Sequence, residues 1–235
     1  MLVALTGPLR KKFFLVPLQV SGDSQVVQHS GFDSVEGFVR HVVASFAAHA
    51  PGDTTLVIKH HPFDRGYYDY GPLIRQQGHQ LGIADRLLYV HDQHLPTLFD
   101  HMRGAIVINS TVGCSALSHG APVKACGGAI YDIEGLTFQG SLDNFWRAAE
   151  HFRPDRELFR RFRAYVIAQT QISGSFYRGR LDEGLCASMT TLMHGYQARR
   201  SSRRLPTELA ISQHYSDRRA LGDAAHPASP HRLRA

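Results

Sequence analysis

Short apolar runs alternate along this chain with longer stretches whose apolar residues recur at helical spacing. The runs are rich in β-branched and aromatic residues and predict strands at 12–20, 54–59, 87–90, 105–108 and 123–125. The other stretches predict helices at 33–49, 95–102, 141–149, 155–170 and 181–197, and the tyrosine-rich stretch 67–80 predicts a loop followed by a helix. This alternation predicts an α/β fold in which helices flank a parallel sheet. Because a proline cannot donate to a sheet ladder, Pro17 suggests that the first strand has an edge or irregular position.

The centre of the pattern is residues 105–123, AIVINSTVGCSALSHGAPV, which predict one strand–helix–strand unit with Ala116 and Leu117 on the helix. Its polar turn runs from Asn109 to Gly113. In a parallel sheet such a turn lies at the carboxyl edge, where the free N–H groups of a helix start attract phosphate. The hydroxyls of Ser110 and Thr111 would add to a phosphate site there, and Gly113 would let a ligand approach the backbone. Asn, Ser and Thr are also ordinary helix caps, so capping alone is an equal alternative.

Two further polar segments come directly after predicted strands. Residues 19–25 follow the first strand and contain Gln19, Ser24 and Gln25, while residues 60–62 follow the second. In an open α/β sheet the carboxyl ends of the strands meet at one crevice. We therefore expect these two segments and the turn at 109–113 to lie together.

Two residue types in these segments suggest chemistry. His61 at a strand end can donate to a phosphate or stabilise a leaving group, and Lys59 can add positive charge. The alternative is a strand-ending turn in which Pro62 sets the backbone angle, with a solvated lysine beside it. Asp23 is the single carboxylate of its turn and is a candidate nucleophile or general base, or else a residue of an Asx turn.

The net charge of +6 is concentrated at the carboxyl end of the chain. Residues 198–235 hold eight arginines and three acidic residues, which leaves a net charge of about +1 for the rest. A nucleic-acid-binding protein would spread its basic residues over a folded face, so we expect no nucleic-acid partner. Pro, Ser and Ala are frequent in this tail, and we expect it to be disordered, either in contact with acidic phospholipid headgroups or solvated without a partner.

Composition excludes several other classes. No run of about 18 apolar residues is present, which predicts no membrane-spanning helix, and the first residues lack the pattern of a signal peptide. The three cysteines have no metal-type spacing, and Cys114 and Cys126 fall at predicted buried positions, as expected for reduced thiols in a cytoplasm. Acidic pairs with metal-ligand spacing are also absent from the sequence, and we expect no metal and no bound cofactor.

Five segments together resemble the capsular polysaccharide biosynthesis family. They are FFLVPLQVSGDSQ, IKHHP, VINSTVGCSALSHGAPV, GGAIYDIEGLTFQGSLDNFW and ISGSFYRG, within residues 13–179. Their order and spacing are similar to those of the bacterial β-Kdo transferases that build the lipid-attached Kdo linker of group 2-type capsules. The VPLQV…DSQ form resembles the lysophospholipid-primed, single-module member more than the double-module one.

The resemblance implies a glycosyltransferase of the GT-B type that retains anomeric configuration and uses CMP-Kdo as donor without a metal. It implies that His61 and Pro62 contact the CMP part of the donor and that Ser110 and Thr111 bind its phosphate. It also implies that Asp23 is the catalytic carboxylate. The partners implied are CMP-Kdo, a lipid or glycolipid acceptor and capsule assembly proteins at the inner membrane, for a cytoplasmic protein that can be peripheral on that membrane.

The chain begins close to the VPLQV strand, so we expect the Rossmann-like, nucleotide-binding half of such an enzyme without most of the amino-terminal domain. We place this domain at residues 1–197 and the arginine-rich tail at 198–235. Two alternatives stay open. One is another enzyme of the same fold, such as a nucleotide-sugar epimerase, which would favour a uridine nucleotide. The other is a non-catalytic subunit of capsule export or assembly.

Overall fold

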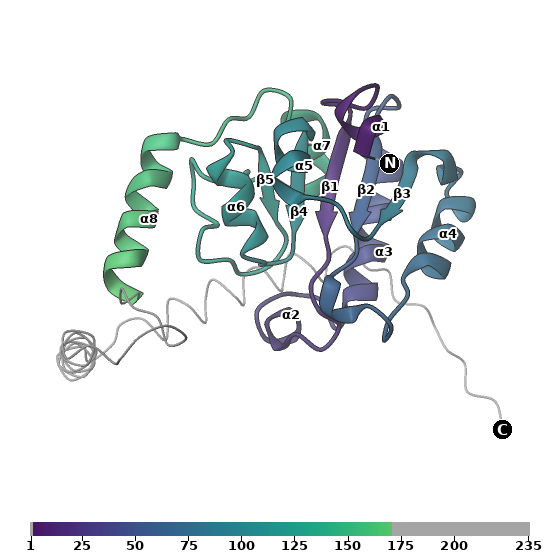
Figure 1. The fold of residues 1–235 in the computed structure, drawn as a ribbon, viewed down its shortest axis with the longest axis horizontal. Helices are drawn as coiled ribbons and strands as arrows, with labels where there is room; N and C mark the ends of the chain where they lie inside the picture. The colour runs from purple at the N-terminus through teal and green to yellow at the C-terminus, as the bar shows by residue number, and fades with distance from the viewer. Residues whose placement is uncertain (1, 171–235) are drawn as a thin grey trace. The chain divides into compact units, whose positions relative to one another are not determined.

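A computed structural model describes residues 2–170 of the chain, of which those up to Arg163 belong to one compact unit. In that unit a single parallel sheet runs between two layers of helices (Figure 1). The α/β fold expected from the sequence is therefore confirmed. The predicted helix at 181–197, the segment ISGSFYRG and the arginine-rich tail lie outside the described residues, and the division after residue 197 stays a prediction.

The sheet has five strands in the order β3-β2-β1-β4-β5. They are β1 (Phe13–Pro17), β2 (Thr55–Lys59), β3 (Leu87–Val90), β4 (Gly104–Val107) and β5 (Val123–Ala125). Every residue of β1, β2 and β4 is buried, whereas the edge strands β3 and β5 are partly open. A parallel strand covered on both faces is expected to be largely apolar, and this explains why β1 and β4 are continuous apolar runs rather than alternating ones.

The expectation that Pro17 marks an edge strand is wrong, because β1 is the central strand. Pro17 is the last residue of β1 and pairs in register with Lys59 of β2. The next amide, Leu18 N, donates to Lys59 O at 2.9 Å, so by alternation the missing N–H of Pro17 would point toward β4. The ladder between β1 and β4 ends at Leu15 and Ala105, and the proline therefore removes no bond from it.

The helices are α1 (Leu2–Thr6), α2 (Ser24–Gln28), α3 (Val35–His49), α4 (Gly71–Gln80), α5 (Leu95–His101), α6 (Val112–Ser118), α7 (Leu142–Ala148) and α8 (Arg156–Thr170), with 3₁₀ turns η1 (Pro62–Asp64) and η2 (Ala84–Arg86). Each helix that the sequence predicts within the described residues is present, and its ends lie within two residues of the predicted ends. In the stretch 67–80, which was predicted as a loop followed by a helix, Gly71–Gln80 is helical. Helices α1 and α2 were not predicted. Too few turns are present in either for an apolar period to show. None of the helices in residues 2–170 has both the length and the apolar character needed to cross a membrane.

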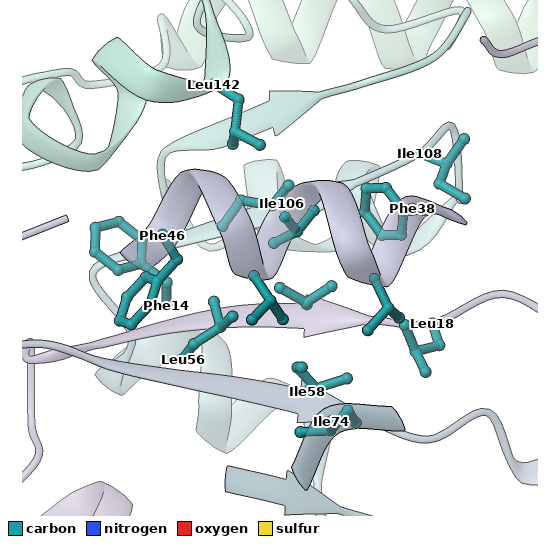
Figure 2. Close-up of a cluster of buried hydrophobic side chains, with 14 of the residues drawn as sticks. Phe14, Leu18, Phe38, Phe46, Leu56, Ile58, Ile74, Ile106, Ile108 and Leu142 are labelled. Atoms are coloured by element: carbon teal, nitrogen blue, oxygen red, sulfur yellow. The ribbon is translucent and has the colours of Figure 1, made fainter. Parts of the chain in front are cut away.

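One face of the sheet packs against α3, α4 and α7 around a large apolar cluster (Figure 2). Phe38 and Phe46 of α3 and Phe14 of β1 lie in this cluster, and the ring of Trp146 packs edge-on against Phe14 at 4.9 Å and against Phe46 at 5.3 Å. The other face packs against α1, α5 and α6 in a second cluster. Because both faces are filled with apolar side chains, the carboxyl edge of the sheet is where the polar segments gather.

Candidate functional site

The order of the strands places a switch point between β1 and β4. From β1 the chain continues outward through β2 and β3 on one side, and β4 and β5 then extend the sheet on the other. Ligands of open α/β proteins bind outside the carboxyl ends of the strands at such a point. The polar segments after β1 and β4 flank this position, so the fold places two of the three expected segments around it.

A pair of amide side chains joins the segments after β1 and β4. Gln19 is buried, and its Nε2 donates to Oδ1 of Asn109 at 3.0 Å. The backbone N–H of Asn109 donates in return to Oε1 of Gln19 at 3.3 Å. The remaining amide group of Asn109 donates to Gln25 O at 2.9 Å and to His29 O at 3.3 Å, at the end of α2. Asn109, a predicted nucleotide contact, therefore uses its side chain to fix α2 against β4.

A buried carboxylate joins the segments after β1 and β2. Asp64 is 3% exposed, and its Oδ2 accepts from Ser21 N at 2.8 Å while its Oδ1 accepts from Ser21 Oγ at 3.1 Å. The hydroxyl of Tyr70 donates to the same carboxylate at 3.4 Å. The expected convergence of the three segments at one edge is confirmed: hydrogen bonds of Gln19, Asn109 and Asp64 connect them.

Asp23 is the N-cap of α2, a helix that the sequence showed only as a polar turn. Its Oδ1 accepts from the backbone N–H of Gln25 at 2.9 Å, and its Oδ2 accepts from Nε2 of Gln19 at 2.9 Å. The carboxylate is half-buried, whereas Ser24 and Gln25 in the first turn of α2 are exposed. The alternative role of Asp23, that of a local turn residue, is therefore observed, because its carboxylate caps α2. The two hydrogen bonds also hold the carboxylate in one orientation.

His61 caps the short η1 turn. Its Nδ1 accepts from the backbone N–H of Phe63 at 3.2 Å, and Pro62 is the first residue of the turn. Because Nδ1 is an acceptor, the neutral ring carries its proton on Nε2. His61 is half-buried and Pro62 is exposed, so the Nε2–H is a donor at the carboxyl edge of the sheet.

Lys59 and His60, which precede His61, are both buried. The ammonium of Lys59 lies 3.5 Å from the backbone oxygen of His60. Burial lowers the pKa of Lys59, and the charge of Asp92 opposes this shift. Lys59 is therefore not the solvated surface lysine of the alternative, but a buried, partly desolvated cation at the end of β2.

The segment after β4 begins α6. Oγ of Ser110 accepts from Val112 N at 3.2 Å, so Ser110 acts as a local cap, whereas the exposed Thr111 makes no capping bond with its side chain. Gly113 is approached by a protein side chain instead of a ligand: a Cβ there would lie 2.2 Å from the hydroxyl of Tyr131. Tyr131 also donates to the backbone oxygen of Ser110. Gly113 is thus needed to seat Tyr131, and Tyr131 fixes the start of α6.

The sequence did not indicate Asp64 or Tyr131 as site residues. Asp64 lies two residues after Pro62, in a segment whose sequence predicts an exposed loop. Tyr131 lies in a loop with no periodic pattern of apolar residues. Their contacts join residues 43 and 21 positions apart in the chain. A single sequence does not show which distant residues are in contact. Gly113 is the one hint, since a glycine at a helix start allows a close neighbour, but the sequence does not identify that neighbour as Tyr131.

The remaining candidate groups for chemistry are thiols and metal ligands. Burial raises the pKa of Cys114 to about 11 and that of Cys126 to about 12, although each residue keeps some exposed surface. Among the described residues no three His, Cys, Asp or Glu side chains form a group that could hold a metal ion. The expectation of a metal-free site stays a prediction.

The fold and its edge define a Rossmann-like α/β protein with a polar site at the switch point. A family model described as "Capsule polysaccharide biosynthesis protein" matches residues 3–177. The chain belongs to this family, as the resemblance of the five segments implied. Two relatives are the capsule polysaccharide export protein KpsS of Escherichia coli, 44% identical over 173 residues, and the capsule polysaccharide modification protein LipB of Neisseria meningitidis serogroup B, 49% identical over 168 residues.

The alignments cover 74% and 71% of this chain but 44% and 39% of those relatives, so the chain spans less than half of their length. Among solved structures, the β-Kdo 2,7 transferase KpsC of Thermosulfurimonas dismutans matches 66% of this chain and 55% of its own at 19% identity and a TM-score of 0.41. Anabaena HepE in complex with UDP matches 71% and 52% at 16% identity and a TM-score of 0.43. Both likenesses are too distant to position a ligand here.

Gly113→Ala should destabilise the protein by about 1–3 kcal/mol, because the new methyl group would overlap the Tyr131 side chain. Urea unfolding followed by circular dichroism measures this loss. Gly52→Ala is the matched control, because a Cβ at Gly52 meets nothing within 4 Å. Equal stability of the two variants would contradict the close packing of Tyr131 on Gly113.

Asp64→Asn should lower the free energy of unfolding by about 2 kcal/mol, since an amide cannot accept both bonds from Ser21. The same unfolding experiment applies, with Asp53→Asn in an exposed turn as control. If Asp64→Asn unfolds at the same urea concentration as the control, the carboxylate does not hold the two segments together.

Proposed function

We propose that this chain is the nucleotide-binding half of a GT-B-type glycosyltransferase of capsular polysaccharide biosynthesis. The reaction is transfer of Kdo from CMP-Kdo to a lysophospholipid-type lipid acceptor or to a growing β-Kdo linker, with retention of configuration. The observation that carries the proposal is the convergence of Asp23, His61 and Ser110 on the carboxyl edge of one sheet, fixed by the bonds of Gln19, Asn109 and Asp64. These are the segments by which the sequence resembles the β-Kdo transferases.

His61 is suited to the leaving group of this reaction. Its Nε2–H is a donor at the sheet edge, because Nδ1 is occupied by the N–H of Phe63. A hydrogen bond to a phosphate oxygen of CMP stabilises the charge that develops there when the glycosidic bond breaks. Ser110 and Thr111 lie across the switch point at the start of α6 and supply two hydroxyls to the same phosphate. Lys59 adds a positive charge beneath it.

Asp23 is suited to the role of nucleophile. One carboxylate oxygen forms a bond to the anomeric carbon of Kdo while the bond from that carbon to the CMP phosphate oxygen breaks. An acceptor hydroxyl then displaces the carboxylate and loses its proton to a base, so that two inversions give retention. Each oxygen of Asp23 accepts one hydrogen bond in the structure and keeps a further lone pair for this chemistry.

The exposed apolar residues support a larger assembly at this edge. Eleven large hydrophobic residues are exposed in the described part of the chain, and six of them lie on segments that follow carboxyl ends of strands: Val27, Phe63, Tyr67, Tyr68, Ile130 and Ile133. Exposed apolar groups concentrated on one edge are typical of a surface that another domain, a lipid or a partner covers. We propose that the acceptor-binding domain, the lipid acceptor and capsule assembly proteins meet the chain on this side, at the inner membrane.

The chain should bind CMP more tightly than UMP in calorimetry without added metal. His61→Ala and Ser110→Ala should each weaken CMP binding by about tenfold, since each removes one hydrogen bond to a charged phosphate. His151→Ala, at an exposed position in another part of the unit, is the control. A preference for UMP would favour a nucleotide-sugar epimerase or a related enzyme. Binding of neither nucleotide would favour a non-catalytic role in export or assembly, which the name of the relative KpsS also suggests.

Asp23→Asn should abolish Kdo transfer, by at least about a thousandfold, in a protein that also carries the remaining half found in the relatives. Asn keeps the helix cap, so fold and CMP binding should be retained, and Asp23→Ser, which also caps, should behave in the same way. Chromatography of a fluorescent lipid acceptor measures the transfer, with Asp53→Asn as the control. Transfer that survives in both Asp23 variants would leave this residue only its role as a cap.

A further inference from the structure

A separate pocket lies beside the candidate site, on the side of β3. It has a volume of about 290 Å³ and is lined by residues of the loop between β2 and α4 and of the end of β3: His60, Arg65, Gly66, Tyr67, Tyr68, Asp69 and His91. Gly66 has a left-handed backbone (φ 83°), which turns the chain between Arg65 and Tyr67.

His60 contributes a buried donor to the wall of this pocket. The residue is 2% exposed, and its Nδ1 lies 2.6 Å from the hydroxyl of Tyr89. That hydroxyl also accepts from the backbone N–H of Tyr70 at 3.4 Å, and we assign its own hydrogen to the bond with Nδ1 of His60. The proton of the neutral imidazole then sits on Nε2, and burial, which lowers the pKa of His60, keeps the ring neutral.

This Nε2 atom is the one buried side-chain nitrogen or oxygen without a hydrogen-bond partner among the described residues. Folded proteins satisfy nearly all such atoms, and an exception at the wall of a cavity points to a missing partner. The partner must be an acceptor, because the atom is a donor. Nε2 is covered in the protein without ligand. The exposed ring of His91 lies 4.7 Å from the ring of His60, and we infer that movement of this side chain opens the path to Nε2.

The other walls combine aromatic faces with groups of both charges. Tyr67 is 84% exposed and Tyr68 is 48% exposed, while Tyr68 stacks on Tyr70 at 6.2 Å so that one of its faces is already covered. Arg65 supplies donors and Asp69 supplies acceptors at the rim. A flat base would need two parallel faces, whereas a sugar ring needs one apolar face and partners for hydroxyl groups that both donate and accept. The volume also suits a single sugar ring better than a larger ligand.

We propose that this pocket binds a saccharide ring, one oxygen of which accepts the hydrogen bond from Nε2 of His60. The inference rests on the proposed function and deepens it, because the pocket is lined by His60, which directly precedes His61, and would hold a sugar next to the phosphate site. The ring belongs either to the Kdo of the donor or to the terminal sugar of the acceptor. The chemistry of recognition is the same for both sources.

The test uses the full 235-residue chain and saturation-transfer NMR with free Kdo and with the methyl β-glycoside of Kdo, which suits weak binding. Tyr67→Ala should weaken binding of the sugar by about five- to tenfold, because it removes the exposed stacking face. Tyr165→Ala is the matched control, since this tyrosine is 67% exposed on α8. Equal sugar affinity of the two variants overturns the proposal.

His60 gives the second pair of variants. His60→Gln keeps a donor near the position of Nε2, whereas His60→Phe keeps the ring shape without a donor. Sugar binding should be lost in His60→Phe and partly kept in His60→Gln. If neither variant folds, Tyr67→Ala still decides the question, because its exposed side chain supports no part of the core.

Added nucleotide separates the two sources and the two proposals. If CMP-Kdo displaces free Kdo from the pocket but CMP does not, the ring in the pocket is the sugar of the donor. If the methyl glycoside still binds when CMP-Kdo is already bound, the ring is the terminal sugar of the acceptor. Sugar binding that depends on Tyr67 in a chain that does not bind CMP supports the pocket and contradicts the proposed donor. CMP binding without any sugar binding, or CMP binding weakened by Tyr67→Ala, overturns the pocket as a saccharide site. Binding of neither ligand overturns both.

Discussion

The hydrogen bonds between Gln19 and Asn109 are the interaction on which the site depends. The segments after β1 and β4 are 90 residues apart in sequence, and they diverge at the switch point of the sheet. The two amide side chains join these segments, and the bonds satisfy the polar groups of Gln19, which is buried and would otherwise be costly to leave unpaired. The same Gln19 orients Asp23, and the same Asn109 fixes the end of α2, so one pair of residues determines where the candidate nucleophile lies.

The sequence predicted the layered architecture because parallel strands buried on both faces must be continuous apolar runs. Strands β3 and β5 were located to the residue as short apolar runs, although they are edge strands and are partly open. Pro17 led to the wrong prediction of an edge strand. Prolines avoid central strands because they remove a hydrogen bond from the ladder, but the ladder between β1 and β4 ends before Pro17 and loses no bond. The gathering of polar residues at one edge was also predictable. The sequence could not predict which of these residues contact one another, since Asp64 and Tyr131 are recognised only through contacts with distant segments.

All the predicted site residues named below lie at the carboxyl edge of the sheet, but the structure gives some of them a positioning role instead of a contact with the ligand. Asn109 and Gly113 are positioning residues that seat α2 and Tyr131, whereas His61, Ser110 and Asp23 keep atoms that can meet a ligand. This polar edge belongs to a chain of the capsule polysaccharide biosynthesis family. The chain spans less than half of the relatives KpsS and LipB, and the apolar residues exposed along this edge are where we propose that a further domain or partner packs.

The most direct test of the central claim is an experimental structure of the chain with CMP bound. The account predicts that a phosphate oxygen lies within about 3 Å of both Nε2 of His61 and Oγ of Ser110, across the switch point between β1 and β4. It also predicts that the Gln19–Asn109 pair is unchanged by binding. CMP found at another edge of the sheet, or with its phosphate away from both side chains, would contradict the account.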